Sequence, residues 1–204
     1  MPFKKVFLLI SLILLFDQAS KIYIKTHFQL YEDIEVFSWF RLVFVENEGM
    51  AWGTRLSDIM PFISPSIAKL SLTIFRILAL SGIAYWLYSS VIKKRSRVLI
   101  VSIALIFAGA LGNIIDSVFY GVIFGDSFGQ VAQVFPEDGG YATLFYGKVV
   151  DMLHFPFWSG TIPETIPLLG GTYFSFFDPV FNVADMAITT GIGTLLIFNK
   201  KAFK

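Results

Sequence analysis

The sequence predicts a mainly α-helical membrane protein with four transmembrane helices. The 204 residues are 55% apolar and only 15% charged, whereas soluble domains are about 45–50% apolar and about 25% charged. In addition, four windows of the chain carry few or no charges, and each is long enough to cross about 30 Å of hydrocarbon at about 1.5 Å per helical residue. A soluble globular protein is therefore not the expected class.

The four apolar windows are expected to form one membrane domain that spans residues 1–204. They lie at residues 6–24, 68–91, 98–120 and 180–198. The first window is similar to a secretory signal because Lys4 and Lys5 precede it, but no small-residue cleavage site follows it. We therefore interpret it as a retained signal anchor.

The basic residues predict the orientation of the chain. Nine of the 16 lie in three short clusters, at residues 4–5, 93–97 and 200–204. An even number of spans places all three clusters on one side of the membrane, and the positive-inside rule makes that side the cytoplasm. We therefore expect both termini in the cytoplasm and two outer segments, residues 25–67 and 121–179.

The two outer segments differ in character. Residues 35–47 are rich in β-branched and aromatic side chains, which favours one or two strands at the membrane surface. Residues 121–179 combine aromatic residues with proline and glycine, a mixture that disfavours long helices and suits the headgroup region of a bilayer. We therefore expect the second segment to be an aromatic-rich loop that rests on the membrane.

Composition also excludes several kinds of chemistry. The chain has no cysteine, which rules out disulfides, thiolate nucleophiles and cysteine-ligated zinc. Its two histidines, His27 and His154, accompany no HExxH, phosphate-loop or nucleophile-elbow motif. The net charge of +1 gives no field that would attract nucleic acid. We therefore expect no metal, no cofactor and no nucleic-acid partner.

Four carboxylates are expected to meet at the outer leaflet. Asp17, Asp116 and Asp185 fall in the outer parts of the apolar windows, and Asp151 lies between apolar neighbours in the second outer segment. A charge inside a membrane costs about 2.5–3.5 kcal/mol on insertion scales, so such residues are candidates for function. Structural roles compete with this interpretation, since Asp17 can pair with Lys21 one helical turn away and Asp116 can orient a loop.

Two asparagines are placed to orient two of these acids. Asn113 precedes Asp116 by three residues, and Asn182 precedes Asp185 by the same number. Residues three apart share one face of a helix, so each amide can hydrogen-bond to its acid.

A cluster of carboxylates supports three functional hypotheses. Two adjacent carboxylates repel each other, so that one can stay neutral and protonate a carbonyl while the other activates water, as in an aspartic peptidase. A proton-coupled membrane carrier and a noncatalytic lipid-binding subunit are the alternatives. A carrier should hold its acids near the midplane, in repeated or broken helices, whereas these acids are predicted at one face. Spacing alone does not decide which two of the four acids would react.

Five sequence blocks together carry a family resemblance. In chain order they are DQxxK from Asp17, NxGxAWG from Asn47, GALGNxxD from Gly109, VVD from Val149 and FNxAD from Phe181. With these blocks the chain resembles bacterial lipoprotein signal peptidase, also called signal peptidase II, over all but its ends.

The resemblance implies an intramembrane aspartic endopeptidase that cuts the signal peptide from a diacylglyceryl-modified prolipoprotein just before the lipidated cysteine. By motif match, Asp151 and Asp185 are the catalytic dyad. The other matched residues bind the substrate or support the site, and they are Asp17, Lys21, Asn47, Gly49, Asn113, Asp116 and Asn182. The resemblance further implies a small extracytoplasmic β-cradle and a site at the outer face of the bacterial cytoplasmic (inner) membrane. We expect the substrate and membrane lipids as partners, and a monomer.

The chain departs from the family pattern in two places. The family usually has arginine directly after the Asp116 position, where this chain has Ser117, and Lys148 is a candidate substitute. The link from Ser117 to Val150, usually short, has 34 residues here. We expect this link to form a surface lid that shapes the approach of the substrate to Asp151 and replaces the positioning role of the arginine. A passive insertion is the alternative.

Overall fold

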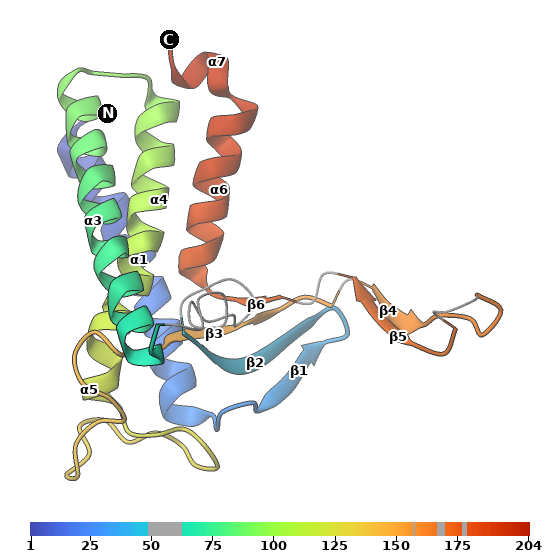
Figure 1. The fold of residues 1–204 in the computed structure, drawn as a ribbon. Coiled ribbons are helices and arrows are strands. Elements are labelled where there is room, and N and C mark those ends of the chain that lie inside the picture. Colours follow the sequence, from blue (N-terminus) through green and yellow to red (C-terminus); the bar gives the residue numbers. More distant parts are fainter. Residues whose placement is uncertain (49–62, 157, 167–169, 177–178) are drawn as a thin grey trace.

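The computed structural model describes residues 1–48, 63–156, 158–166, 170–176 and 179–204. Helices run side by side through most of the molecule, and a small antiparallel sheet lies across one end of them (Figure 1). The two chain termini lie together at the opposite end, beside the turn that joins the second and third long helices (Figure 1).

Three long apolar helices form most of the helical bundle. They are α1 (Phe3–His27), α3 (Pro65–Ile92) and α4 (Arg97–Ile115), and α4 continues through the π-helical turn η2 (Asp116–Tyr120) and the short α5 (Gly121–Ile123). Each of these three helical stretches is long and apolar enough to cross a membrane. Ser64 and Ser96 cap α3 and α4 by accepting hydrogen bonds from backbone N–H groups, which stabilises the helix starts.

The fourth apolar helix is shorter than the sequence predicts. α6 (Val183–Ile197) has 15 residues, which gives a length of about 22 Å at about 1.5 Å per residue, less than the 30 Å or so of a hydrocarbon core. The predicted window began at residue 180, but Val180–Phe181 form strand β6 and Asn182 caps the helix. Beyond Phe198 the chain turns into the short α7 (Asn199–Ala202).

The sheet is built from both outer segments. Its strands are β1 (Asp33–Phe37), β2 (Phe40–Asn47), β3 (Val149–His154) and β6, and they pair antiparallel in the order β1-β2-β3-β6. The strands expected within residues 35–47 are thus the hairpin β1-β2. The second outer segment is more ordered than the loop we expected. In addition to β3 it holds a separate hairpin of β4 (Trp158–Thr161) and β5 (Tyr173–Phe176), which extends away from the main sheet (Figure 1).

Two apolar clusters hold these elements together. The first joins α1, α3, α4 and α7 near the termini, around Ile100 and Ile103. The second lies at the sheet end and joins α1, β2, β3 and the chain after η2, with these buried members: Ile24, Phe28, Phe44, Tyr120, Phe124, Ala132, Val150 and Met152. The second cluster brings strand β3 against the outer end of the bundle.

The long link between Ser117 and Val150 packs into this second cluster. Lys25 of α1 is fully buried, and its Nζ donates to Ser127 Oγ over 2.8 Å and pairs with Glu46 of β2. The same Nζ lies 4.6 Å from the ring centroid of Tyr141. A buried cation needs such partners because removing it from water is costly. The link is therefore attached to α1 and β2, and its expected role in shaping the approach of the substrate stays a prediction.

Glycine allows α4 and α6 to approach closely. A Cβ atom added at Gly109 would lie 2.2 Å from the carbonyl oxygen of Ala184 and 2.8 Å from Cγ1 of Ile188. No real side chain tolerates the first of these distances, and a backbone oxygen cannot move aside as a flexible side chain can. Close contact between these two helices therefore requires glycine at residue 109.

Replacing Gly109 with alanine should weaken the helical bundle. Overpacking of this kind costs about 1–3 kcal/mol, so we expect the Gly109→Ala protein to unfold at a clearly lower temperature in detergent. Gly193→Ala is the matched control, because a Cβ there meets nothing within 4 Å and alanine favours helix. Equal melting temperatures for the two variants would contradict this account of the α4–α6 contact.

Candidate active site

Asp151 lies in the middle of strand β3 and is only 3% exposed. Both of its carboxylate oxygens accept hydrogen bonds from amide side chains. Asn47 Nδ2 donates to Oδ2 over 3.2 Å, and Asn182 Nδ2 donates to Oδ1 over 2.7 Å. Strand β2 supplies the first amide because it pairs with β3, and the second comes from the residue that starts α6. The carboxylate of Asp151 is thus fixed from two sides.

Asp185 lies in the first turn of α6 and takes part in a capping box. Its backbone N–H donates to Asn182 Oδ1 over 2.9 Å, and Asn182 N donates back to Asp185 Oδ2 over 3.3 Å. The other carboxylate oxygen of Asp185, Oδ1, accepts from Asn113 Nδ2 over 2.9 Å. The side chain is therefore oriented by its own helix and by α4.

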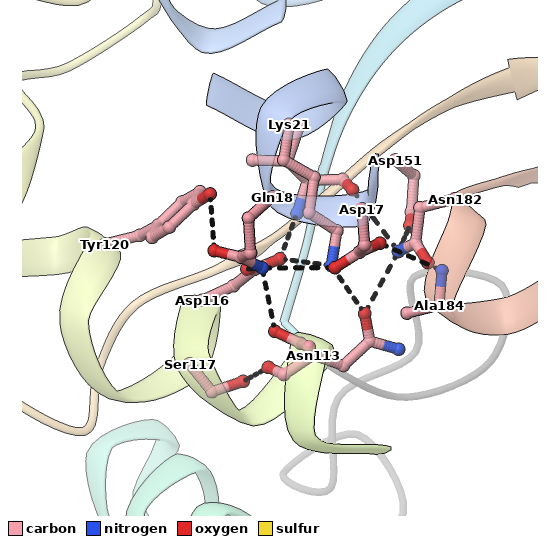
Figure 2. Close-up of polar contacts among 12 residues, drawn as sticks. Asp17, Gln18, Lys21, Asn113, Asp116, Ser117, Tyr120, Asp151, Asn182 and Ala184 are labelled. Atoms are coloured by element: carbon pink, nitrogen blue, oxygen red, sulfur yellow. Dashed lines mark hydrogen bonds and ion pairs between the residues drawn. The ribbon is translucent and has the colours of Figure 1, made fainter. Parts of the chain in front are cut away.

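Asn182 connects the two acids. Its side chain is fully buried, and Nδ2 lies 2.7 Å from Asp151 Oδ1, 3.1 Å from Asn113 Oδ1 and 3.3 Å from the carbonyl oxygen of Val150 (Figure 2). Its Oδ1 accepts from the N–H of Asp185. A single residue therefore joins the carboxylate of Asp151 to the helix turn that carries Asp185.

The surroundings of Asp151 favour its protonated form. Burial and then the neighbouring charge of Asp185 raise the pKa of Asp151 to about 7, against the opposing effect of the Asn47 and Asn182 amides and of Lys21. A carboxyl group that keeps its proton near neutral pH can act as the acid of an acid–base pair.

A buried ionic cluster lies beside the two acids. Lys21 Nζ is 3.0 Å from Asp17 Oδ2 and 2.8 Å from Asp116 Oδ2, and it donates to Asn113 Oδ1 over 2.8 Å (Figure 2). Asp17, Lys21 and Asp116 have no exposed surface. The pairing of Asp17 with Lys21 expected from the sequence is confirmed, and Asp116 shares the same ammonium group.

Gln18 completes this cluster, although the sequence analysis did not include it among the site residues. Its Nε2 donates to Asp17 Oδ2, to Asp116 Oδ1 and to the carbonyl oxygen of Gly112 at 3.0–3.2 Å, and its Oε1 accepts from Tyr120 OH over 3.1 Å. The only signal in the sequence was its place in the DQxxK block.

The ionic cluster positions the backbone next to each of the two acids. Asp17 Oδ1 accepts from the N–H of Ala184, which directly precedes Asp185, over 2.9 Å (Figure 2). Asp116 Oδ2 accepts from the N–H of Val150, which directly precedes Asp151, over 3.3 Å. The start of α6 and the middle of β3 are therefore both attached to one set of buried charges.

Lys148, the candidate substitute for the family arginine, forms an ion pair just before strand β3, but not with Asp116. Lys148 Nζ pairs with Glu46 Oε2 at 3.0 Å, whereas the cation that contacts Asp116 is Lys21. Ser117, which occupies the arginine position, donates to the carbonyl oxygen of Asn113 over 2.9 Å. Its hydroxyl group therefore bonds to the preceding helical turn.

One further charged residue faces this region and was missed by the sequence analysis. Arg76 of α3 interacts electrostatically with Asp185 and Asp151. The sequence carried one clue, because an arginine within an apolar window is costly and seldom accidental. Gly49 lies outside the described residues, as does the rest of its block through Gly53. Within the described part of the chain, no group of three or more His, Asp or Glu residues could hold a metal ion.

Comparison with known proteins identifies the family. A family model described as signal peptidase (SPase) II matches residues 9–200. The chain belongs to the signal peptidase II family. A lipoprotein signal peptidase of Porphyromonas gingivalis is 46% identical over 196 residues, covering 95% of this chain and 82% of the relative. A lipoprotein signal peptidase of Amoebophilus asiaticus is 34% identical over 190 residues, covering 91% and 73%.

Solved structures share the fold of this signal peptidase II chain. A bacterial membrane enzyme solved by the in meso method at 2.3 Å has a TM-score of 0.59 and 25% identity, covering 98% of this chain and 89% of the other. A second such structure, at 1.9 Å, has a TM-score of 0.60 and 24% identity, covering 96% and 92%. The chain is therefore a membrane protease that acts as a lipoprotein signal peptidase, and the carrier and lipid-binding alternatives are set aside.

Loss of the Lys21 ammonium group should unfold this region. Lys21→Met leaves two buried carboxylates without a cation, and breaking a buried ion pair in this way costs about 3–5 kcal/mol. We expect the purified variant to melt at a much lower temperature, and the triple variant Lys21→Met/Asp17→Asn/Asp116→Asn to recover part of the loss. Lys94→Met, at an exposed turn residue, is the control. A Lys21→Met protein as stable as this control would contradict the role of the cluster.

Proposed function

We propose that this protein is an aspartic endopeptidase in which Asp151 and Asp185 are the catalytic dyad, and that it cuts diacylglyceryl-modified prolipoproteins just before the lipidated cysteine. The observation that carries the proposal is the Asn182 bridge, because its amide bonds to Asp151 and to the backbone of Asp185. The raised pKa of Asp151 supports it as well. The substrate class rests on family membership.

The two acids divide the chemistry between them. Asp151 keeps a proton near neutral pH and donates it to the scissile carbonyl oxygen. Asp185, which accepts hydrogen bonds from Asn113 Nδ2 and Asn182 N, takes a proton from water as the water oxygen attacks the carbonyl carbon. In the second step Asp185 returns its proton to the leaving nitrogen, the C–N bond breaks and Asp151 regains its proton. Asp151 takes this proton from a hydroxyl group of the tetrahedral intermediate, so the products are the carboxylic acid of the signal peptide and the amine of the lipidated cysteine, which ionise to carboxylate and ammonium.

The polar residues around the dyad support the reaction by holding the two carboxyl groups in place. Asn47, Asn113 and Asn182 orient the carboxylates, and the cluster of Asp17, Lys21 and Asp116 fixes the backbone beside them. We assign Gly49 to the substrate side of the site by motif match alone. The active unit we propose is a monomer, because α4, α6, β2 and β3 of one chain supply both acids and the amides that orient them.

The proposed orientation places the dyad at the outer face of the bacterial inner membrane. Both termini and the α3–α4 turn lie at one end of the bundle, away from the sheet (Figure 1), and that end carries the basic clusters, which favour the cytoplasm. Termini at the same end require an even number of crossings. We therefore propose that α6 is the fourth crossing despite its length, because bilayers thin locally around short helices. The outer leaflet then supplies the lipid-anchored substrate and the surrounding lipids.

Amide substitutions at the dyad test the assignment directly. Asp151→Asn and Asp185→Asn keep the size of each side chain but remove its acid–base function, which is worth about 10²–10⁴ in rate. We expect each purified variant to lose at least about 10²-fold in kcat on a diacylglyceryl-modified test substrate, measured by gel shift. Asp138→Asn, at an exposed loop acid, should keep wild-type activity. Substantial cleavage by either dyad variant at unchanged melting temperature would refute the assignment.

A chelator distinguishes carboxylate chemistry from metal-assisted hydrolysis. The proposed mechanism uses two carboxyl groups and water, so activity of the purified protein should persist after treatment with a strong chelator. Activity that disappears in the chelator and returns with zinc or another divalent ion would count against the dyad mechanism.

A further inference from the structure

Arg76 lies on the inward face of helix α3. Lys69, Thr73 and Arg76 are four and three residues apart, so they follow one face of the helix. Lys69 is 8% exposed and Thr73 is 1% exposed. Phe75 and Leu78, on the other side of the helix, are 68% and 66% exposed. The partly buried arginine therefore points toward the bundle and not toward the surrounding lipid.

The same face of α3 contacts the segments that carry the dyad. Lys69 Nζ donates to the carbonyl oxygen of Glu48 over 2.6 Å. Glu48 directly follows Asn47, whose side-chain amide donates a hydrogen bond to Asp151. Thr73 Oγ1 donates to the carbonyl oxygen of Phe145 in the link before β3. Arg76 lies one helical turn further along this face, and its charge interacts with those of Asp185 and Asp151.

The other ionic groups around the dyad already have partners of opposite charge. These pairings are Lys21 with Asp17 and Asp116, Lys25 and Lys148 with Glu46, and Lys69 with Glu48. The remaining titratable group on β3 is His154, at the end of the strand. Within the described residues, by contrast, no ion pair or hydrogen bond involves Arg76. Lys21 also acts on Asp151, but its ammonium group is shared with Asp17 and Asp116, whereas the charge of Arg76 acts on Asp185 first and then on Asp151.

We infer that Arg76 is the positioning residue that sets the ionisation of the proposed dyad. A positive charge near two carboxyl groups favours the state with one negative charge over the fully protonated state. Arg76 thereby keeps one acid ionised, ready to accept a proton from water, at the pH at which the other still holds its proton. This inference rests on the proposed function and adds a residue from α3, which carries none of the five family blocks.

The pH profile of kcat/KM tests the inference. In the wild-type protein, activity falls at low pH as the last ionised acid of the dyad is protonated, and this acid limb belongs to the pair jointly. Removing the positive charge makes ionisation of the pair less favourable, so the acid limb of Arg76→Gln should move to higher pH. At pH values below the acid limb, kcat/KM of Arg76→Gln then falls about tenfold for each pH unit by which the limb has moved. At alkaline pH it returns to the wild-type value. Arg76→Lys keeps the charge and should keep the wild-type limb.

Matched variants separate this effect from a structural one. Arg97→Gln removes an exposed arginine at the start of α4, and its limb should equal that of the wild type. Arg76→Leu suits an apolar helix and replaces Arg76→Gln if the polar variant does not purify as folded protein. An unchanged limb in the neutral Arg76 variants overturns the inference, whether activity is normal or uniformly reduced. Absence of cleavage by the wild-type protein, or full activity of Asp185→Asn, would instead overturn the proposed function.

Discussion

The buried pairing of Lys21 with Asp17 and Asp116 is the interaction on which the rest of the structure depends. Three ionic groups without solvent contact are tolerable only if each is satisfied, and each of the two acids also accepts a hydrogen bond from a backbone N–H group outside the cluster. One binds the N–H of Ala184 and the other that of Val150. The ion pairs between α1 and η2 therefore determine where α6 begins and where β3 runs, although neither α6 nor β3 contributes a charge to the cluster.

Much of the architecture was predictable because membrane insertion imposes simple rules. The apolar windows marked the long helices, and the Asp17–Lys21 spacing gave an ion pair that the structure confirms. The length of α6 was not predictable from hydropathy, because Val180 and Phe181 are as apolar as the helix that follows. Their assignment to a strand depends on pairing with β3, a contact distant in sequence.

The site was only partly predictable, for a related reason. Motifs identified Asp151 and Asp185 as candidates, but composition and spacing left four acids equivalent. The four acids differ in the groups that contact them. Asp17 and Asp116 share the ammonium group of a lysine, whereas Asp151 and Asp185 accept hydrogen bonds from side-chain amides. The contacts of Lys25 with Ser127 and Glu46 join three segments that are distant in sequence, so no local sequence pattern predicts them. The role proposed for Arg76 likewise depends on contacts of α3 with Glu48 and Phe145, which are distant in sequence.

The two tasks of Asn182 limit which amino acids can occupy that position. Serine, threonine, aspartate and asparagine all serve as helix N-caps because each offers an acceptor oxygen. Asparagine alone among them carries a separate NH₂ group, so it can accept from Asp185 N and donate to Asp151 at the same time. Asn182→Asp would keep the cap but place a third negative charge beside the dyad, and Asn182→Ser would require one oxygen to do both tasks. Capping the helix alone, or orienting the acid alone, could be done by other residues. Among the four N-cap residues, only asparagine does both.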